Sequence, residues 1–131
     1  MIKFFFIPGE ALGAIGSSES LDILEKYSTS ETVEVAETCQ LAVQRIKWLL
    51  DEQKKSVIDA SYKENPYCSH DPTPATKDKN VTELREILLD ESLPLFERYR
   101  AMFALRNKGD DTSVQALADG NFIKSCLFLP G

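Results

Sequence analysis

The feature that most constrains the fold is a residue pattern that occurs twice, at positions 11–24 and again at positions 104–117. Each copy has Ala-Leu, a glycine four residues after the leucine, and two apolar residues beyond the glycine. The copies are Ala11, Leu12, Gly16, Leu21 and Leu24, and Ala104, Leu105, Gly109, Val114 and Leu117. Glycine commonly ends a helix, and apolar residues three or four apart mark one face of the next helix. The pattern therefore predicts stacked helix pairs, with an irregular helical bundle as the alternative.

Hydrophobic periodicity divides the chain into predicted helices. They are the turns from Gly9 to Ile15 and the segments Glu19–Tyr27, Thr32–Glu52, Val81–Asp90, Leu95–Lys108 and Ser113–Asp119. Pro94 suits the first turn of the helix at 95–108, and the Asp-Asp-Thr run at 110–112 can cap the helix after it. Together with the repeated pattern, these segments predict an all-α fold, a truncated HEAT-like helical-repeat solenoid of about five or six helices.

A polar segment, Lys54–Lys79, interrupts the helical pattern. It contains Pro66, Pro72 and Pro74 and only scattered apolar residues. Proline is disfavoured inside helices, and a segment of this composition buries too little apolar surface to fold by itself. We therefore predict a disordered central linker at 54–79. It would separate helical halves at 9–53 and 80–120, with atypical edges at 1–8 and 121–131.

Charge, hydropathy and cysteine usage exclude several classes of protein. The net charge of -6 makes nucleic acid a poor partner. The apolar run Phe4–Ile7 is shorter than the about 7–15 residues of a signal-peptide core, and no run approaches the ~20 residues of a membrane span. The three cysteines form no Cys-x-x-Cys pair. This argues against a zinc site or a disulfide framework, and it favours a reducing compartment, the cytoplasm.

Three stretches of the sequence closely resemble the deoxyhypusine hydroxylase family. They are residues 9–16 (GEALGAIG), residues 34–43 (EVAETCQLAV), and the run from Leu88 to Ser92 that continues through Phe96 to Asn107. With the segments between them, the resemblance extends from Gly9 to Gly120. It implies a HEAT-repeat fold of two helical halves joined by a linker, and it places Lys54–Lys79 in that linker.

The resemblance also implies a chemistry that this sequence does not complete. In the family, His-Glu pairs hold a di-iron (Fe) centre that hydroxylates the deoxyhypusine side chain of translation initiation factor 5A. One pair is expected at positions 6 and 7, where this chain has Phe6 and Ile7. Another is expected in the Arg-His-Glu that follows Leu-Phe at 127–128, where this chain has Leu-Pro-Gly at 129–131. The only histidine is His70, in the predicted linker. We therefore predict no metal ligand and no catalytic residue in this chain, and no activity by itself.

Two hypotheses for the function follow. The first is a deoxyhypusine hydroxylase-like protein without iron ligands of its own. The second is a non-catalytic HEAT-repeat scaffold that binds proteins, or a truncated isoform, because the familiar sequence gives way abruptly to unrelated residues at both edges. The apolar edges, residues 4–7 and 126–129, also predict self-association.

Two side chains are candidates for a functional role, and each has a structural alternative. Glu10 lies four residues after position 6 and shares its helix face, so it can face the cationic substrate side chain. A solvated or capping glutamate is the alternative. His70 follows Cys68 by two positions, but metals need more ligands than these. We expect His70 to be a solvated loop residue.

The other residues that stand out are interpreted as structural. Arg98, Arg100 and Arg106 are predicted to form a salt-bridged surface stripe with Glu91 and Glu97. The remainder are Trp48 and Cys39 as packing residues, Cys126 as an exposed thiol, and the pairs Asp51–Glu52 and Asp110–Asp111 as solvated helix ends.

Overall fold

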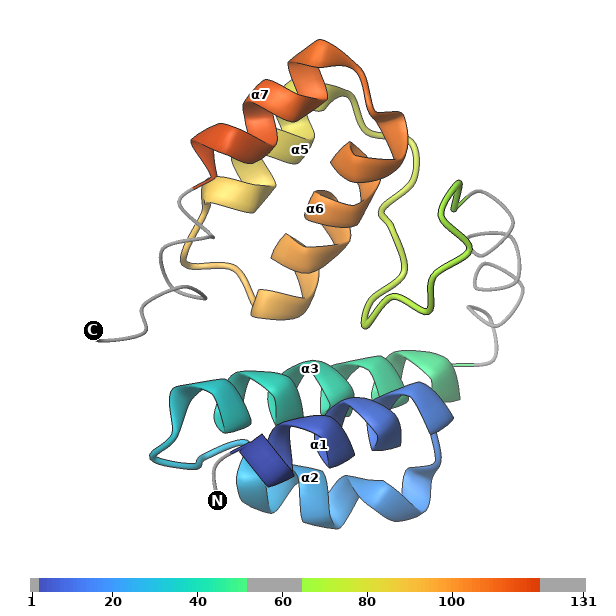
Figure 1. The fold of residues 1–131 in the computed structure, drawn as a ribbon, viewed down its shortest axis with the longest axis vertical. Helices are drawn as coiled ribbons and strands as arrows, with labels where there is room; N and C mark the ends of the chain where they lie inside the picture. Colours follow the sequence, from blue (N-terminus) through green and yellow to red (C-terminus); the bar gives the residue numbers. More distant parts are fainter. Residues whose placement is uncertain (1–2, 52–64, 121–131) are drawn as a thin grey trace. The chain divides into compact units, whose positions relative to one another are not determined.

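The computed structural model describes residues 3–51 and 65–120, and the side chains of the first range from Pro8 onwards. Within these residues the chain forms six α-helices and one 3-10 turn, with no β-strand (Figure 1). The chain divides into two compact units, residues 1–73 and residues 74–131. The all-α class predicted from the sequence is confirmed for these residues.

The first unit has α3 as its central helix. It consists of α1 (Lys3–Ile15), the 3-10 turn η1 (Ser18–Ser20), α2 (Leu21–Tyr27) and α3 (Val33–Leu50). Both α1 and α2 pack against α3. The buried residues of this core are Leu24, Val35, Cys39, Ala42, Val43 and Ile46, with Leu12, Leu21 and Tyr27 packed against them. The α3 members recur every three or four residues, which is the spacing that predicted the helix.

The helices α1 and α3 approach each other so closely that two positions of α1 require a small residue. A Cβ atom at Gly13 would lie 2.9 Å from the Cβ of Ala42, and one at Gly9 would lie 3.3 Å from Cγ2 of Thr38. These contacts pair position 9 with 38 and position 13 with 42, so the two helices run in the same direction. The absence of a Cβ atom at Gly13 therefore permits the close approach of α1 and α3 at Ala42.

The second unit is built around α6. It consists of α5 (Val81–Leu89), α6 (Leu95–Lys108) and α7 (Asp111–Asp119), and α6 packs against the other two. Asn80 begins α5 with a capping box, because its side chain accepts the N–H of Glu83 while the Glu83 carboxylate accepts the N–H of Asn80, each at 2.9 Å. The buried core residues are Leu84, Leu88, Ala101, Ala104, Leu105 and Ala116.

The two copies of the repeated sequence pattern form the same turn. Gly16 and Gly109 have left-handed backbone conformations, with φ of 74° and 64°. Each donates its N–H to the carbonyl of the leucine four residues earlier, Leu12 at 3.1 Å and Leu105 at 3.2 Å. Only glycine adopts this conformation without a steric penalty, so the repeated glycine ends α1 and α6 alike.

The residue after each of these glycines caps the helical turn that follows. Ser17 Oγ accepts a backbone N–H two residues further on at 3.3 Å, and Asp110 accepts the N–H of Ser113 at 2.7 Å. Hydrogen bonds from the Thr112 hydroxyl and from Ser113 hold the pKa of the Asp110 carboxyl below its usual value. Because Asp110 is the capping residue, α7 begins at Asp111 and not at the predicted Ser113.

The described part of the predicted linker, residues 65–79, contains no helix, and a group of polar side chains organises its beginning. Nδ2 of Asn65 donates to the carbonyl of Ser69 at 2.9 Å and to Oδ2 of Asp71 at 3.1 Å. The Ser69 hydroxyl donates to Oδ1 of Asp71 at 2.7 Å. Residues 54–64 lie outside the described residues, and the mobility of 54–79 stays a prediction.

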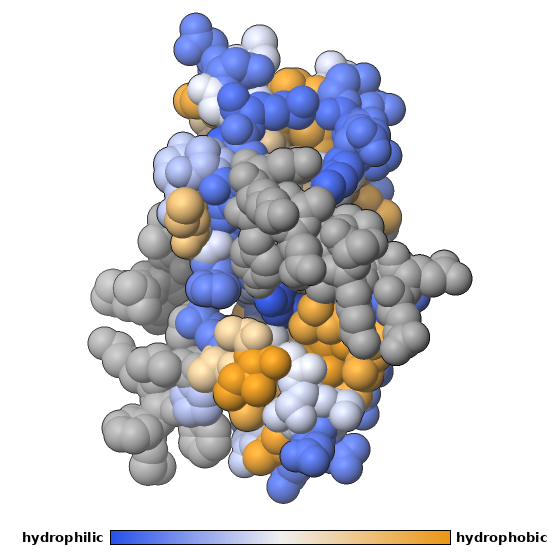
Figure 2. All heavy atoms as spheres, turned by 90° about the vertical axis from the view of Figure 1, so that its right-hand side faces the viewer, coloured by the Kyte–Doolittle hydropathy of each residue, from blue (hydrophilic) through white to orange (hydrophobic). Residues whose placement is uncertain are grey.

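The surface of the described residues carries scattered large apolar side chains. They are Ile15, Ile23, Val33, Leu50, Tyr67, Leu89 and Val114. Figure 2 shows such apolar surface, in orange, beside hydrophilic residues. The apolar edges at 4–7 and 126–129 have side chains outside the description, so self-association also stays a prediction. Across the described ranges, no helix combines the length and the apolar character that crossing a bilayer requires.

Candidate functional site

Glu10, the predicted substrate-facing residue, lies on the exposed side of α1. Its position follows from helix geometry, because Gly9 and Gly13 face α3 and the next residue along a helix is rotated by about 100°. The carboxylate is therefore accessible to a cationic group from solvent. The backbone of positions 6 and 7 is part of α1, but the structure describes side chains only from Pro8 onwards. The role of Glu10 stays a prediction.

His70 is exposed in the loop that follows residue 65, as predicted, and Cys68 in the same loop is exposed as well. Cys68 has a left-handed backbone conformation, with φ of 51°, and its N–H donates to the Asn65 carbonyl at 3.3 Å. Among residues 3–51 and 65–120, no three His, Cys, Asp or Glu side chains gather in a way that could hold a metal ion.

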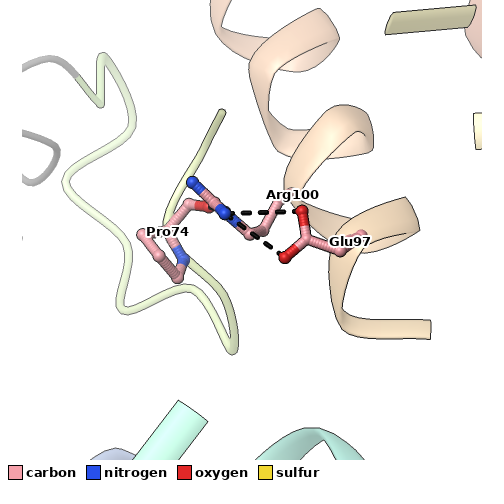
Figure 3. A network of polar contacts seen from close by, with 3 residues as sticks. All are labelled: Pro74, Glu97 and Arg100. Atoms are coloured by element: carbon pink, nitrogen blue, oxygen red, sulfur yellow. Dashed lines mark hydrogen bonds and ion pairs between the residues drawn. The ribbon is translucent and has the colours of Figure 1, made fainter. Parts of the chain in front are cut away.

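The Arg100 side chain contacts Glu97 and Pro74, both in the second unit (Figure 3). Its Nη1 lies 3.3 Å from Oε1 of Glu97, and its Nε donates to the Pro74 carbonyl at 3.2 Å. The backbone carbonyl of Arg100 in turn accepts the N–H of Thr76 at 3.1 Å. The predicted pairing with Glu97 is thus confirmed, and the side chain and backbone of Arg100 together hold residues 74–76 against α6.

The other two arginines of α6 also have structural partners. Arg98 Nε donates to the carbonyl of Leu88 at 3.0 Å, near the end of α5. Arg106 lies over the Phe103 ring, 4.7 Å from its centroid, and its Nη2 donates to Oδ1 of Asn107 at 2.8 Å. The stripe therefore serves the packing of the second unit, and it is not a preformed anion site.

The residues interpreted as structural take the expected places where the structure describes them. Trp48 and Cys39 of α3 are buried, and burial raises the pKa of the Cys39 thiol, which keeps it protonated at neutral pH. Asp51 follows the last residue of α3 and Asp110 precedes the first residue of α7, so both are helix-end residues. The predictions for Glu52 and Cys126 fall outside the described residues.

Sequence reasoning missed Arg45, which is only 6% exposed although it carries a charge. Its Nε donates to the carbonyl of Gly13 at 3.0 Å, and its Nη1 donates to the carbonyl of Asp71 at 3.4 Å. A signal was available, because Arg45 lies three residues after Ala42 and one before Ile46, on the packed side of α3. A cation on such a face requires acceptors from neighbouring segments.

Comparison with curated proteins finds deoxyhypusine hydroxylases. The chain is 57% identical to the Danio rerio protein over 122 residues, which cover 92% of this chain and 39% of that protein. It is 53% identical to the Homo sapiens protein over 120 residues, covering 92% of this chain and 38% of that one. The Drosophila melanogaster protein is 52% identical over 120 residues. The chain therefore spans less than two fifths of the length of these relatives.

The fold gives the same result. The structure of human deoxyhypusine hydroxylase in complex with glycerol matches 87% of this chain with a TM-score of 0.75 and 55% sequence identity, and the match covers 38% of that protein. No protein-family model matches the chain. The resemblance inferred from residues 9–16, 34–43 and 88–107 is confirmed.

Proposed function

We propose that this chain is a deoxyhypusine hydroxylase-like protein that does not catalyse the family reaction by itself. The premise is that the chain is homologous to 38 to 39% of the length of the deoxyhypusine hydroxylases. That reaction is the iron-dependent hydroxylation of deoxyhypusine in translation initiation factor 5A. The observation that supports this proposal is the contrast between the preserved helical framework and the missing ligand residues.

The residues present do not fit the di-iron centre that the family implies. Such a centre needs imidazole and carboxylate ligands brought together in space. This chain supplies one histidine in total, and His70 is exposed in the loop after residue 65. The positions where His-Glu pairs are expected hold Phe6, Ile7 and the Leu-Pro-Gly run at 129–131. Phenylalanine, isoleucine, leucine, proline and glycine side chains offer no metal-binding atom, so we derive no step through iron.

What this chain can contribute is a surface for the substrate protein. Glu10 is exposed on α1, and the chain as a whole carries a net charge of -6. An acidic surface favours encounter with a cationic side chain such as deoxyhypusine, whose amine is protonated at neutral pH. We propose translation initiation factor 5A as the partner and Glu10 as a substrate-facing residue. We also propose a cytoplasmic location, which the free thiols of Cys39 and Cys68 suit.

Iron loading tests the proposal directly. The purified chain is loaded with Fe(II) under anaerobic conditions, separated from free metal, and analysed for bound iron, with full-length human deoxyhypusine hydroxylase treated in parallel. We expect no stoichiometric iron on this chain, because one imidazole cannot replace the several that the centre needs. The helical circular dichroism of the same preparation controls for a loss of folding.

Two tightly bound irons per chain in the unmodified protein, with a di-iron absorption band, would overturn the proposal. Hydroxylation of deoxyhypusine-bearing factor 5A by the isolated chain would do the same.

A further inference from the structure

Arg45 connects three segments of the first unit. It belongs to α3, its Nε binds the Gly13 carbonyl of α1 at 3.0 Å, and its Nη1 binds the Asp71 carbonyl of the loop at 3.4 Å. A buried guanidinium is costly unless carbonyl or carboxylate oxygens replace the water that it loses. The burial of the Arg45 guanidinium therefore depends on the positions of α1 and of the loop, because these segments supply the two carbonyls.

The contact with α1 is a helix cap that comes from another helix. The last carbonyls of a helix have no partner within it, and a cation near them is favourable. α1 ends at Ile15 and has no basic residue in its last turn. The Leu12 carbonyl is bound by the N–H of Gly16, and the next one, at Gly13, is bound by Arg45. The guanidinium of α3 thus completes the end of α1.

The same arrangement occurs independently in the second unit. α5 also has no basic residue in its last turn, and Arg98 of α6 donates its Nε to the carbonyl of Leu88, again at 3.0 Å. Two helices with the same deficit are therefore capped by the same atom of an arginine from a packed neighbour. Capping by an arginine of a packed neighbour is therefore not peculiar to the first unit.

The loop that Arg45 reaches is itself organised. Asn65 is buried, its Oδ1 accepts the N–H of Tyr67 at 2.9 Å, and its Nδ2 donates to Ser69 and Asp71. Both carboxylate oxygens of Asp71 are engaged, one by Asn65 and one by Ser69. These contacts fix the backbone of Asp71, and with it the direction of the carbonyl that Arg45 binds.

We propose that Arg45 is a positioning residue that couples the end of α1 to the loop at 65–71. When the loop is formed, the Asp71 carbonyl holds the guanidinium where it caps Gly13. When the loop opens, the guanidinium loses an acceptor and the cap on α1 weakens. The capping of the end of α1 therefore depends on a loop more than 50 positions away in the sequence.

Amide hydrogen exchange on the metal-free chain tests this coupling without reference to iron or activity. The reporters are the N–H of Gly16 for the end of α1 and the N–H of Tyr67 for the loop. The N–H of Ser28, which closes α2 with a 2.9 Å bond, is the reference within the same unit. In Asn65→Ala, which leaves Arg45 and Gly13 intact, we expect exchange at both reporters to accelerate by about tenfold, the scale of one charge-assisted hydrogen bond, with Ser28 unchanged.

Substitution of the arginine should give the reciprocal result. Arg45→Met keeps the length of the side chain and removes the donors, so both reporters should again accelerate. Arg45→Lys keeps the positive charge but replaces the planar guanidinium with a single ammonium group, which we expect to bind one carbonyl and not both. Compared with Arg45→Met, it should slow the exchange of the Gly16 N–H more than that of the Tyr67 N–H. The control is Lys47→Met, because Lys47 pairs with Glu25 at an exposed site where such a pair contributes little. Normal Gly16 exchange in Asn65→Ala would overturn the proposal, as would equal acceleration at Ser28.

Discussion

Replacing Gly13 with alanine is expected to destabilise the first unit by about 2 kcal/mol, although alanine is the better helix former. The gain in helix propensity is about 1 kcal/mol, and overpacking between two backbones costs about 3 kcal/mol at the upper end of the usual range. The new Cβ would lie 2.9 Å from the Cβ of Ala42 and 3.1 Å from its Cα. The Cα cannot move away without the whole of α3. Urea unfolding followed by the fluorescence of Trp48, the only tryptophan, measures the loss.

The matched control for this substitution is Gly9→Ala, one helical turn earlier. There the new Cβ would meet Cγ2 of Thr38 at 3.3 Å and Sγ of Cys39 at 3.6 Å. Both are side-chain atoms that can shift slightly, so the strain is offset by the gain in propensity and the net change should be below about 0.5 kcal/mol. Equal effects at the two positions would contradict the view that the backbone distance at Ala42 sets the spacing of α1 and α3.

The parts of the fold that local chemistry determines were predictable from the sequence. The segment 95–108 has an initial proline before it and a glycine after it, and α6 has those bounds. Gly16 and Gly109 were identified as helix ends, and both adopt left-handed conformations. In these cases the residues that decide the structure are neighbours in the sequence, so a short window contains the whole cause.

The parts that depend on distant contacts were not predictable in the same way. Composition marks residues 65–79 as linker, yet Asn65 uses its side chain to bind Ser69 and Asp71, and no periodicity reveals such a network. Arg45 looks like one of the many charged residues of a long helix. Its role appears only when the Gly13 carbonyl, 32 positions earlier, is seen to lie beside it.

For the candidate site, the main expectation from the sequence stays a prediction. It rests on the single histidine of the chain, which is too few for a di-iron centre. The structure adds that Glu10 is exposed and that the arginines of α6 bind structural partners. The direction in which a helical residue points follows from what its neighbours pack against, and for Glu10 that required the contacts of Gly9 and Gly13 with α3.

Replacing Leu105 with alanine is expected to destabilise the second unit by about 3 kcal/mol while the first unit keeps its stability. Leu105 has no exposed surface and lies in the core that includes Leu84 and Leu88. The first unit has a separate core around Ile46. Small separate cores melt over broad ranges and need not unfold together. The N–H of Asp90, which closes α5, should therefore exchange faster, whereas the unfolding midpoint of Trp48 fluorescence should not move.

The matched variant is Leu12→Ala, at the equivalent position of the repeated pattern. Leu12 is only partly buried against the core of the first unit, so its loss should cost less, about 1–2 kcal/mol. It should lower the Trp48 midpoint and leave the exchange of the Asp90 N–H unchanged. The two variants thus make opposite predictions for the two probes. If both probes shifted together in both variants, the units would unfold as one cooperative body, because a cavity in either core would then be felt across the whole chain.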